Sequence, residues 1–142
     1  QLAVQLGYMF RHNPSFTLAR KIVADKVLGD IFEVEASFGK IVGEKDRREL
    51  NEFRGGGMFE LGCHVIDAVT LLMGQPQRVT AFNRSSGAAP ADLQDNQMAV
   101  LEYPKALAVI KAAVIDPQGG PRRALILHGS NGTLELQPIE AN

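Results

Sequence analysis

In the first third of the chain, the spacing of apolar residues is typical first of a strand, then of a helix and then of a strand again. This part of the sequence therefore predicts a strand, a helix and a second strand. Residues 2–10 are apolar and β-prone and predict a strand, and Asn13-Pro14 then begins a helix. From residue 15 to 27 apolar residues recur at helical spacing, and Gly29 is placed to end that helix. Residues 31–38 alternate, which predicts a strand whose apolar face carries Phe32, Val34, Ala36 and Phe38.

The remainder predicts one more helix followed by about five strands. Residues 41–54 are charged and irregular and predict a loop with room for a short helix. Three glycines, 55–57, precede a helix from about 58 to 73, which Gly74 and Pro76 close. Strand patterns follow at 78–83, 97–103, 107–115, 124–128 and 133–136, with turn signals at Pro104-Lys105 and Gly129–Gly132.

This order of elements predicts an α+β fold. Tight turns between consecutive strands favour antiparallel pairing, so we expect a largely antiparallel sheet with the helices on one face. The other sheet face then needs cover from a second copy or another domain. No Gly-x-Gly-x-x-Gly follows a strand, and the strand-rich second half does not supply a cofactor-binding βαβ unit.

Composition narrows the class of protein. The chain has 142 residues, 45% hydrophobic and 22% charged, which fits one globular domain, residues 1–142. A net charge of −1 suggests no nucleic-acid partner, and the pairs Arg47-Arg48 and Arg122-Arg123 are expected to be solvated. No apolar run approaches the ~20 residues that span a bilayer, so no membrane partner is expected. One cysteine forms no internal disulfide and predicts neither a zinc cluster nor any metal site, and it fits a reducing, cytoplasmic location.

Candidate chemistry gathers at the second predicted helix. Glu60, His64 and Asp67 are spaced four and three apart and fall on one helical stripe. A carboxylate one turn from an imidazole is a workable acid/base pair. Glycines such as Gly57 allow a ligand to approach the backbone at the positive end of the helix. The alternative is a chance pair that faces solvent and does nothing.

A second cluster lies where the first predicted strand meets its helix. Tyr8, Arg11, His12 and Asn13 offer polar groups to a polyhydroxylated ligand, although Asn13 equally suits a helix cap. Two further residues have ordinary explanations: Cys63 as a small buried hydrophobe and His128 as loop polarity.

Four motifs in order resemble the Gfo/Idh/MocA family of oxidoreductases. The resemblance spans nearly the whole chain, and each motif alone is modest. The motifs are Gly7-Tyr8-Met9-Phe10-Arg11-His12-Asn13-Pro14, Leu28-Gly29-Asp30-Ile31, the segment from Gly55 to Asp67, and Gly129-Ser130-Asn131-Gly132-Thr133-Leu134-Glu135-Leu136.

The resemblance implies the substrate-binding and oligomerisation domain of an NAD(P)-dependent oxidoreductase for a sugar or polyol. It implies an open-faced sheet like that of the C-terminal domain of glyceraldehyde-3-phosphate dehydrogenase, paired into a homodimer or tetramer through that face. NAD or NADP is then bound mainly by an N-terminal Rossmann domain outside residues 1–142, and the chain alone is expected to be an inactive fragment.

The resemblance also implies roles for single residues. His64 falls at the position of the family's acid/base, and Glu60 stands where the family has Asp, which keeps the charge on a longer side chain. The implied substrate-binding residues are Tyr8, Arg11, His12, Asn13, Gly57 and Asp67. Two alternatives stay open: a non-catalytic binding or dimerisation module of the same fold, and an unrelated α+β domain.

Overall fold

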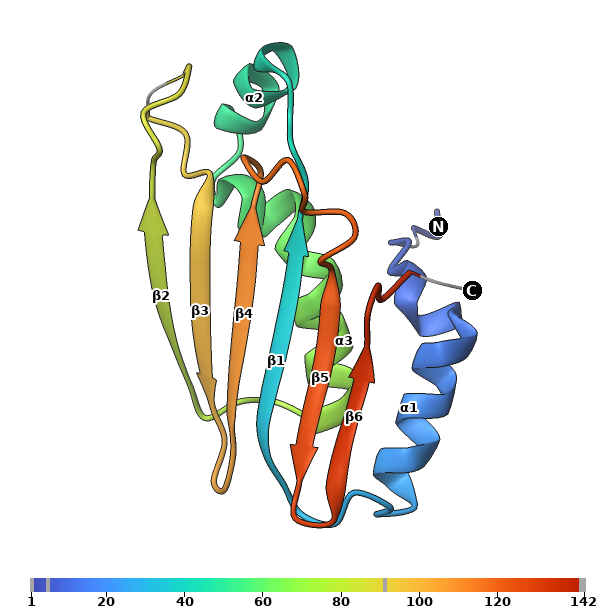
Figure 1. The fold of residues 1–142 in the computed structure, drawn as a ribbon. Coiled ribbons are helices and arrows are strands. Elements are labelled where there is room, and N and C mark those ends of the chain that lie inside the picture. The colour runs from blue at the N-terminus through green and yellow to red at the C-terminus, as the bar shows by residue number, and fades with distance from the viewer. Residues whose placement is uncertain (1, 5, 91, 141–142) are drawn as a thin grey trace.

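The structure, a computed structural model, describes residues 2–4, 6–90 and 92–140. Figure 1 shows an open, twisted sheet of six strands with helices packed behind it and at its ends. The strands are β1 (Ile31–Gly39), β2 (Arg78–Arg84), β3 (Asn96–Glu102), β4 (Leu107–Ala113), β5 (Ala124–Gly129) and β6 (Gly132–Leu136). The helices are η1 (Met9–His12), α1 (Pro14–Ala24), α2 (Glu44–Asn51), η2 (Met58–Gly62) and α3 (Cys63–Met73).

The strands lie in the order β2-β3-β4-β1-β5-β6. Four neighbouring pairs are antiparallel, and only β1 and β4 run parallel, so the prediction of a largely antiparallel sheet is confirmed. The hairpins predicted at Pro104-Lys105 and Gly129–Gly132 connect β3 to β4 and β5 to β6. The β1–β4 pairing joins segments far apart in sequence, for which the turn pattern carried no signal.

One face of the sheet makes the hydrophobic core. Helix α3 lies behind the central strands in Figure 1, while the front face carries no helix. Val65 and Val69 of α3 are fully buried, which matches the apolar stripe of a helix that faces a sheet. The strands contribute buried residues in alternation, among them Val34, Ala36, Phe38, Ala99, Leu101, Ala108, Ile110, Leu125 and Leu127. The predicted α+β architecture with helices on one face is therefore confirmed.

The first helix begins as its sequence predicts and ends slightly earlier. The Asn13 side chain accepts a hydrogen bond from the Phe16 backbone N–H at 3.2 Å, and Pro14 occupies the first turn. The helix ends at Ala24, three residues before the predicted limit, because Lys26 takes a positive φ of 53° in the turn before Gly29.

The strand predicted over residues 2–10 is wrong for the described part of that segment. Residues 2–4 and 6–8 form no regular element, and Met9–His12 is a 3-10 helix. A β-prone segment forms a strand only beside another strand that supplies backbone hydrogen bonds. No strand pairs with the described residues of this segment. Only Phe10 is buried, whereas Leu2 and Leu6 are exposed; residues 1 and 5 lie outside the described residues.

Two further predictions are wrong, one for Phe32 in β1 and one for Arg47 in the segment that follows β1. Phe32 was expected in the core but is 53% exposed, because a register shift between Ile31 and Glu33 turns it away from the buried alternation. Residues 44–51 form helix α2, and Arg47 on it is buried, not solvated. Within the described residues, no helix combines the length and apolar character that crossing a membrane requires.

Candidate active site

An open cleft lies between the N-terminal segment and the start of the second long helix. Its walls combine apolar side chains with a few polar groups from both segments, a composition typical of small-molecule sites. The lining residues are Leu6, Gly7, Tyr8, Arg54, Gly55, Met58, Phe59, Glu60, Cys63, His64 and Ile66. The structure therefore brings together Tyr8, Glu60 and His64 from the two predicted clusters.

The glycine run shapes the entry to the helix, and its first member, Gly55, lines the cleft. Gly55 and Gly56 have positive φ of 103° and 49°, which turns the chain sharply into η2. The Gly57 N–H donates to the Gln94 carbonyl at 3.4 Å, and the Met58 N–H donates to the Gln97 side chain at 2.5 Å. These donors are used within the protein, and buried Gly57 is not among the lining residues, so the expected ligand contact of Gly57 is not supported.

The helix starts with a wide turn. Residues 58–62 form a π-helical turn and the α-helix proper begins at Cys63. Such turns are rare and occur often at functional sites. The segment presents Glu60 and His64 to the cleft from consecutive turns of one helical stretch.

Aromatic rings enclose the imidazole of His64. The ring centroids of Tyr8, Phe10 and Phe38 lie 6.4, 6.2 and 5.7 Å from that of His64. The His64 Nδ1 is buried and has no hydrogen-bond partner in the part of the chain that the structure describes. Because a buried polar atom without a partner costs free energy, this nitrogen is suited to meet a hydroxyl or water that enters the cleft.

Glu60 pairs with a lysine and not with His64. Its Oε1 accepts from the Lys40 Nζ at 2.8 Å, while Oε2 is buried without a partner. No hydrogen bond joins Glu60 to His64 among the described residues. The carboxylate thus lies one turn from the imidazole, as the spacing predicts, but the lysine at the end of β1 orients it.

Arg11 and Asp67 are engaged with each other. The Arg11 guanidinium donates to both oxygens of Asp67, at 2.9 Å from Nε to Oδ2 and 2.5 Å from NH2 to Oδ1. The hydrogen bond and charge of Asp67 raise the pKa of Arg11 further. The pair ties η1 to α3, and the Arg11 guanidinium lies 5.7 Å from the Tyr8 ring. The pair lies next to Tyr8, whose ring packs near His64; the substrate contact expected of Arg11 and Asp67 stays a prediction.

The remaining predicted residues lie outside the cleft. His12 and Arg11 line a second depression, which adjoins the cleft because Leu6, Gly7 and Tyr8 line both. The Asn13 side chain is used as the cap of α1. Of the predicted site residues, Tyr8, Glu60 and His64 therefore share the cleft, whereas Arg11, His12, Asn13, Gly57 and Asp67 are not among its lining residues.

Several residues at or beside the cleft were not predicted as site residues from the sequence. Lys40 is 20 positions from Glu60, and only the fold brings the two together. Arg54 and Phe59 flank the glycines and are visible as candidates only once that turn is known to line a cleft. Cys63 is half-buried, and burial together with the charges of Glu60 and Asp67 raises the pKa of its thiol. The thiol therefore stays protonated at neutral pH, which does not favour a nucleophile.

Comparison with known proteins identifies the family. The model of the GFO/IDH/MocA C-terminal domain matches residues 16–135. The chain therefore belongs to the GFO/IDH/MocA family as its C-terminal domain, and the alternative of an unrelated α+β domain is excluded.

Relatives with known names are dehydrogenases. The chain is 29% identical over 125 residues to scyllo-inositol 2-dehydrogenase (NADP(+)) IolW of Bacillus subtilis, covering 87% of this chain and 34% of that protein. It is 28% identical over 135 residues to D-xylose 1-dehydrogenase (NADP(+)) 2 of Haloferax volcanii, covering 93% of this chain and 40% of that protein. The chain thus spans less than half the length of these relatives.

A solved structure confirms the fold. The crystal structure of aldose-aldose oxidoreductase from Caulobacter crescentus, complexed with glycerol, superposes with a TM-score of 0.83 at 24% sequence identity. The match covers 95% of this chain and 41% of that chain.

Proposed function

We propose that this chain is the substrate-binding domain of an NAD(P)-dependent oxidoreductase that acts on a carbinol group of a sugar, polyol or related hydroxy compound. Family membership supports the reaction class, and the names of the two dehydrogenase relatives support the substrate class and cofactor. The observation that carries the proposal is the imidazole of His64, held among three aromatic rings at a cleft with its Nδ1 unpaired.

The residues of the cleft fit one part of such a reaction. Apolar Leu6, Met58 and Phe59 suit the C–H face of a sugar or polyol, and the polar atoms of His64 and Glu60 without partners among the described residues suit its hydroxyl groups. The backbone donors of Gly57 and Met58 are already used, so they do not cradle phosphates. We therefore assign most of the cofactor contacts to a nucleotide-binding domain of the whole protein outside residues 1–142, and we expect residues 1–142 alone to be inactive.

In this proposal His64 handles the proton of the reacting hydroxyl. When bound, a nicotinamide cofactor would supply the hydride chemistry at the carbinol carbon. His64 takes the hydroxyl proton in the oxidation and gives it back in the reverse direction. Lys40 holds Glu60 one helical turn from the imidazole, so that a carboxylate lines the same cleft as the imidazolium that forms. Tyr8, which lies next to the pair of Arg11 and Asp67, closes one side of the ring.

Replacing His64 tests this role in the full-length protein. We expect His64→Ala to lower kcat by about 10²- to 10⁴-fold, the usual contribution of a positioned acid/base. The matched control is Tyr103→Phe, which removes a hydroxyl group from a ring far from the cleft. The Tyr103 hydroxyl donates to the Gly74 carbonyl, at the opposite end of α3. It should leave kcat unchanged, and circular dichroism should show both variants folded. Unchanged turnover of His64→Ala would favour a non-catalytic binding or dimerisation module.

We also propose that the uncovered sheet face pairs with a second copy into a homodimer or tetramer. Phe82, Met98 and Leu107 expose apolar area on this face. Its β2 edge carries Arg78 and Arg84, whereas β1 and β6 carry acidic residues, so two copies related by a twofold axis present opposite charges to each other. A reducing, cytoplasmic location fits the single cysteine and belongs to the same proposal.

A further inference from the structure

Arg123 is largely buried beside the aromatic rings that enclose His64. It comes directly before β5, and its side chain is 16% exposed, so the expectation that Arg122-Arg123 is solvated is wrong for Arg123. Its Nε donates to the Gly39 carbonyl at 3.0 Å, and its Nη1 donates to the Glu140 Oε1 at 2.5 Å. These two hydrogen bonds hold the guanidinium at the end of β1.

The guanidinium held in this way covers the ring of Phe38. The Arg123 Cζ lies 4.1 Å from the centroid of that ring, which is within the range of a cation–π interaction. Phe38 is 3% exposed, and exclusion of water strengthens such an interaction. Among the three rings around His64, that of Phe38 is the nearest, at 5.7 Å between centroids. One buried ring therefore contacts both the cation and the imidazole.

The imidazole of His64 depends on its aromatic neighbours for its orientation. Its Nδ1 has no hydrogen-bond partner in the described part of the chain, and the nearby carboxylate of Glu60 pairs with Lys40. In many acid/base histidines a hydrogen bond to one ring nitrogen sets the orientation of the imidazole. Here ring packing takes the place of that hydrogen bond. A Phe38 ring that is free to rotate would leave the imidazole less well placed for the reaction.

We propose that Arg123 is a positioning residue for the imidazole of His64 and acts through the ring of Phe38. The proposal rests on the acid/base role proposed above for His64. Arg123 is not among the residues that line the cleft, so its effect on the reaction is indirect. Its charge is balanced by Glu140, so the effect lies in the geometry of the imidazole and not in its electrostatic surroundings.

Proton NMR of the histidine side chains in the chain of 142 residues tests this contact. Arg123→Gln keeps a side chain that can donate to the Gly39 carbonyl but removes the cation, whereas Arg123→Lys retains a cation. We expect Arg123→Gln to shift and broaden the imidazole signals of His64. The same signals should keep their wild-type positions in Arg123→Lys.

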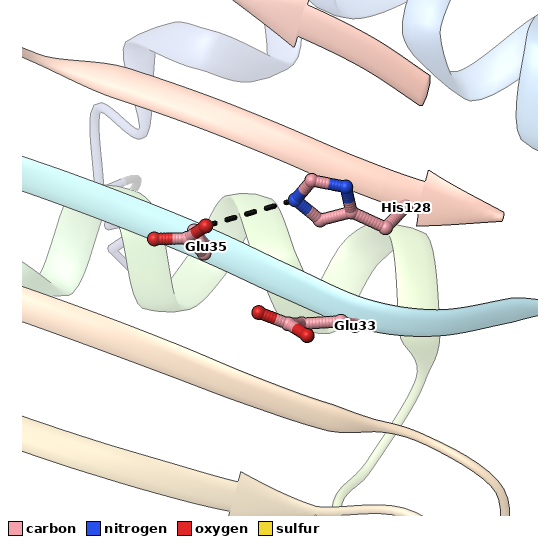
Figure 2. Close-up of side chains that lie close together, drawn as sticks. All are labelled: Glu33, Glu35 and His128. Carbon is pink, nitrogen blue, oxygen red and sulfur yellow. Dashed lines mark ion pairs between the residues drawn. The ribbon is translucent and has the colours of Figure 1, made fainter. Parts of the chain in front are cut away.

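His128 provides an internal control in the same spectra. Figure 2 shows its imidazole on the uncovered face, turned toward Glu35, and the His128 Nε2 lies 3.6 Å from the Glu35 Oε1. His128 belongs to β5, which corrects the expectation of loop polarity. Its signals should not move in either variant, because neither Arg123 nor Phe38 is among its ring contacts.

Glu140→Gln is the matched control variant. It removes the ion pair and leaves the guanidinium over Phe38, so the His64 signals should stay in place. His64 signals that are unchanged in Arg123→Gln, or that Glu140→Gln moves equally, would overturn the proposal. Should circular dichroism show that Arg123→Gln is unfolded, Arg123→Lys decides: wild-type His64 signals support the proposal, and displaced signals contradict it.

Kinetics of the full-length protein separate positioning from folding. The probe is the aldose or inositol that the wild-type protein oxidises fastest with its nicotinamide cofactor. We expect Arg123→Gln to lower kcat about 3- to 30-fold and to change KM less than about twofold, because a misplaced reacting group slows the chemical step. Arg123→Lys and Glu140→Gln should stay near the wild-type kcat.

Two kinetic results contradict the positioning role: an equal loss of kcat in all three variants, or a rise in KM alone. Failure of the proposed function looks different. In that case His64→Ala turns over at the wild-type rate, whereas failure of the role of Arg123 leaves His64→Ala impaired and Arg123→Gln at the wild-type kcat.

Discussion

Single side chains in this domain owe their roles to partners that lie far along the sequence. Arg47 is 5% exposed and donates to the carbonyls of Ala88 and Ala89, and its NH2 lies 2.7 Å from the Oδ2 of Asp95. The fully buried Asp95 also accepts from the Ser86 backbone N–H and hydroxyl. This network binds helix α2 to the loop before β3, beside the glycine turn of the cleft.

The buried Arg47–Asp95 pair carries stability that depends on pH. Burial alone would raise the pKa of Asp95, but the hydrogen bonds from Ser86 and Arg47 outweigh it and lower the pKa below 3.8. The carboxylate therefore stabilises the fold above about pH 3.8, and this contribution is lost as the pH falls through the lowered pKa of the folded state. We expect Asp95→Asn to lower the free energy of unfolding by about 3–5 kcal/mol at pH 7, because Arg47 is left as an unpaired buried charge.

Urea denaturation measures this change, and helix α2 supplies a matched control. Glu44 and Arg48 form an exposed pair one turn apart on the same helix. Glu44→Gln should change the free energy of unfolding by less than about 1 kcal/mol. Equal losses in Asp95→Asn and Glu44→Gln would contradict a special contribution from the buried pair.

The sequence predicted which residues line the candidate site better than it predicted the residues with which they pair. The spacing of Glu60 and His64 placed both on one helical stripe, and both line the cleft. Arg47 was taken for a solvated charge because its partner, Asp95, is 48 positions away. Lys40 escaped notice for the same reason. Pairings across such separations depend on the fold, which local patterns do not encode.

At the scale of elements, the turn of Gly55 and Gly56 sets where the helix that lines the cleft starts. A side chain at Gly56 would place its Cβ 2.5 Å from the Gln94 carbonyl oxygen, at a φ that L-residues rarely adopt. The helical pattern of residues 58–73 was read correctly, but its first turn is π-helical. Periodicity did not distinguish the two forms, because apolar positions recur at similar intervals in both.

Gly56→Ala tests the importance of this turn. We expect a loss of about 1–3 kcal/mol in the free energy of unfolding, since the alanine must leave its preferred backbone region and push against the Gln94 carbonyl. Thermal denaturation measures the loss. Gly120→Ala is the control, because its Cβ meets nothing within 4 Å and its φ is not positive. A Gly56→Ala variant as stable as Gly120→Ala would show that the turn tolerates a side chain.

At the scale of the whole molecule, the uncovered sheet face leaves large apolar side chains in contact with water. Phe82 and Leu107 are 50% and 51% exposed, on strands at opposite sides of β3. The helices on one face and the strands after residue 30 followed from the order of patterns along the chain, whereas the strand predicted at residues 2–10 did not form. The strand order did not, because hydrophobic alternation specifies which face a residue joins and not which strand lies beside it.

The proposed pairing of this face predicts a mass that one substitution changes. Light scattering coupled to gel filtration should show a dimer or tetramer for the wild-type chain, and a smaller species for Phe82→Glu, because a charge at a buried apolar contact is costly. Val27→Glu makes the same exchange at a side chain that is 60% exposed but not on a strand. It should keep the wild-type mass. A monomeric wild type, or an unchanged mass for Phe82→Glu, would contradict the pairing.

The central place of β1 also has a consequence for synthesis. This strand is made first, yet its two neighbours, β4 and β5, come from residues 107–129. While the ribosome is still completing β3, both hydrogen-bonding edges of β1 are unpaired and Val34 and Phe38 lack the strands beside them. Non-local pairing of this kind slows folding, and unpaired edges invite association with other chains. The edges of β1 are therefore most open to association until residues 107–129 have left the exit tunnel.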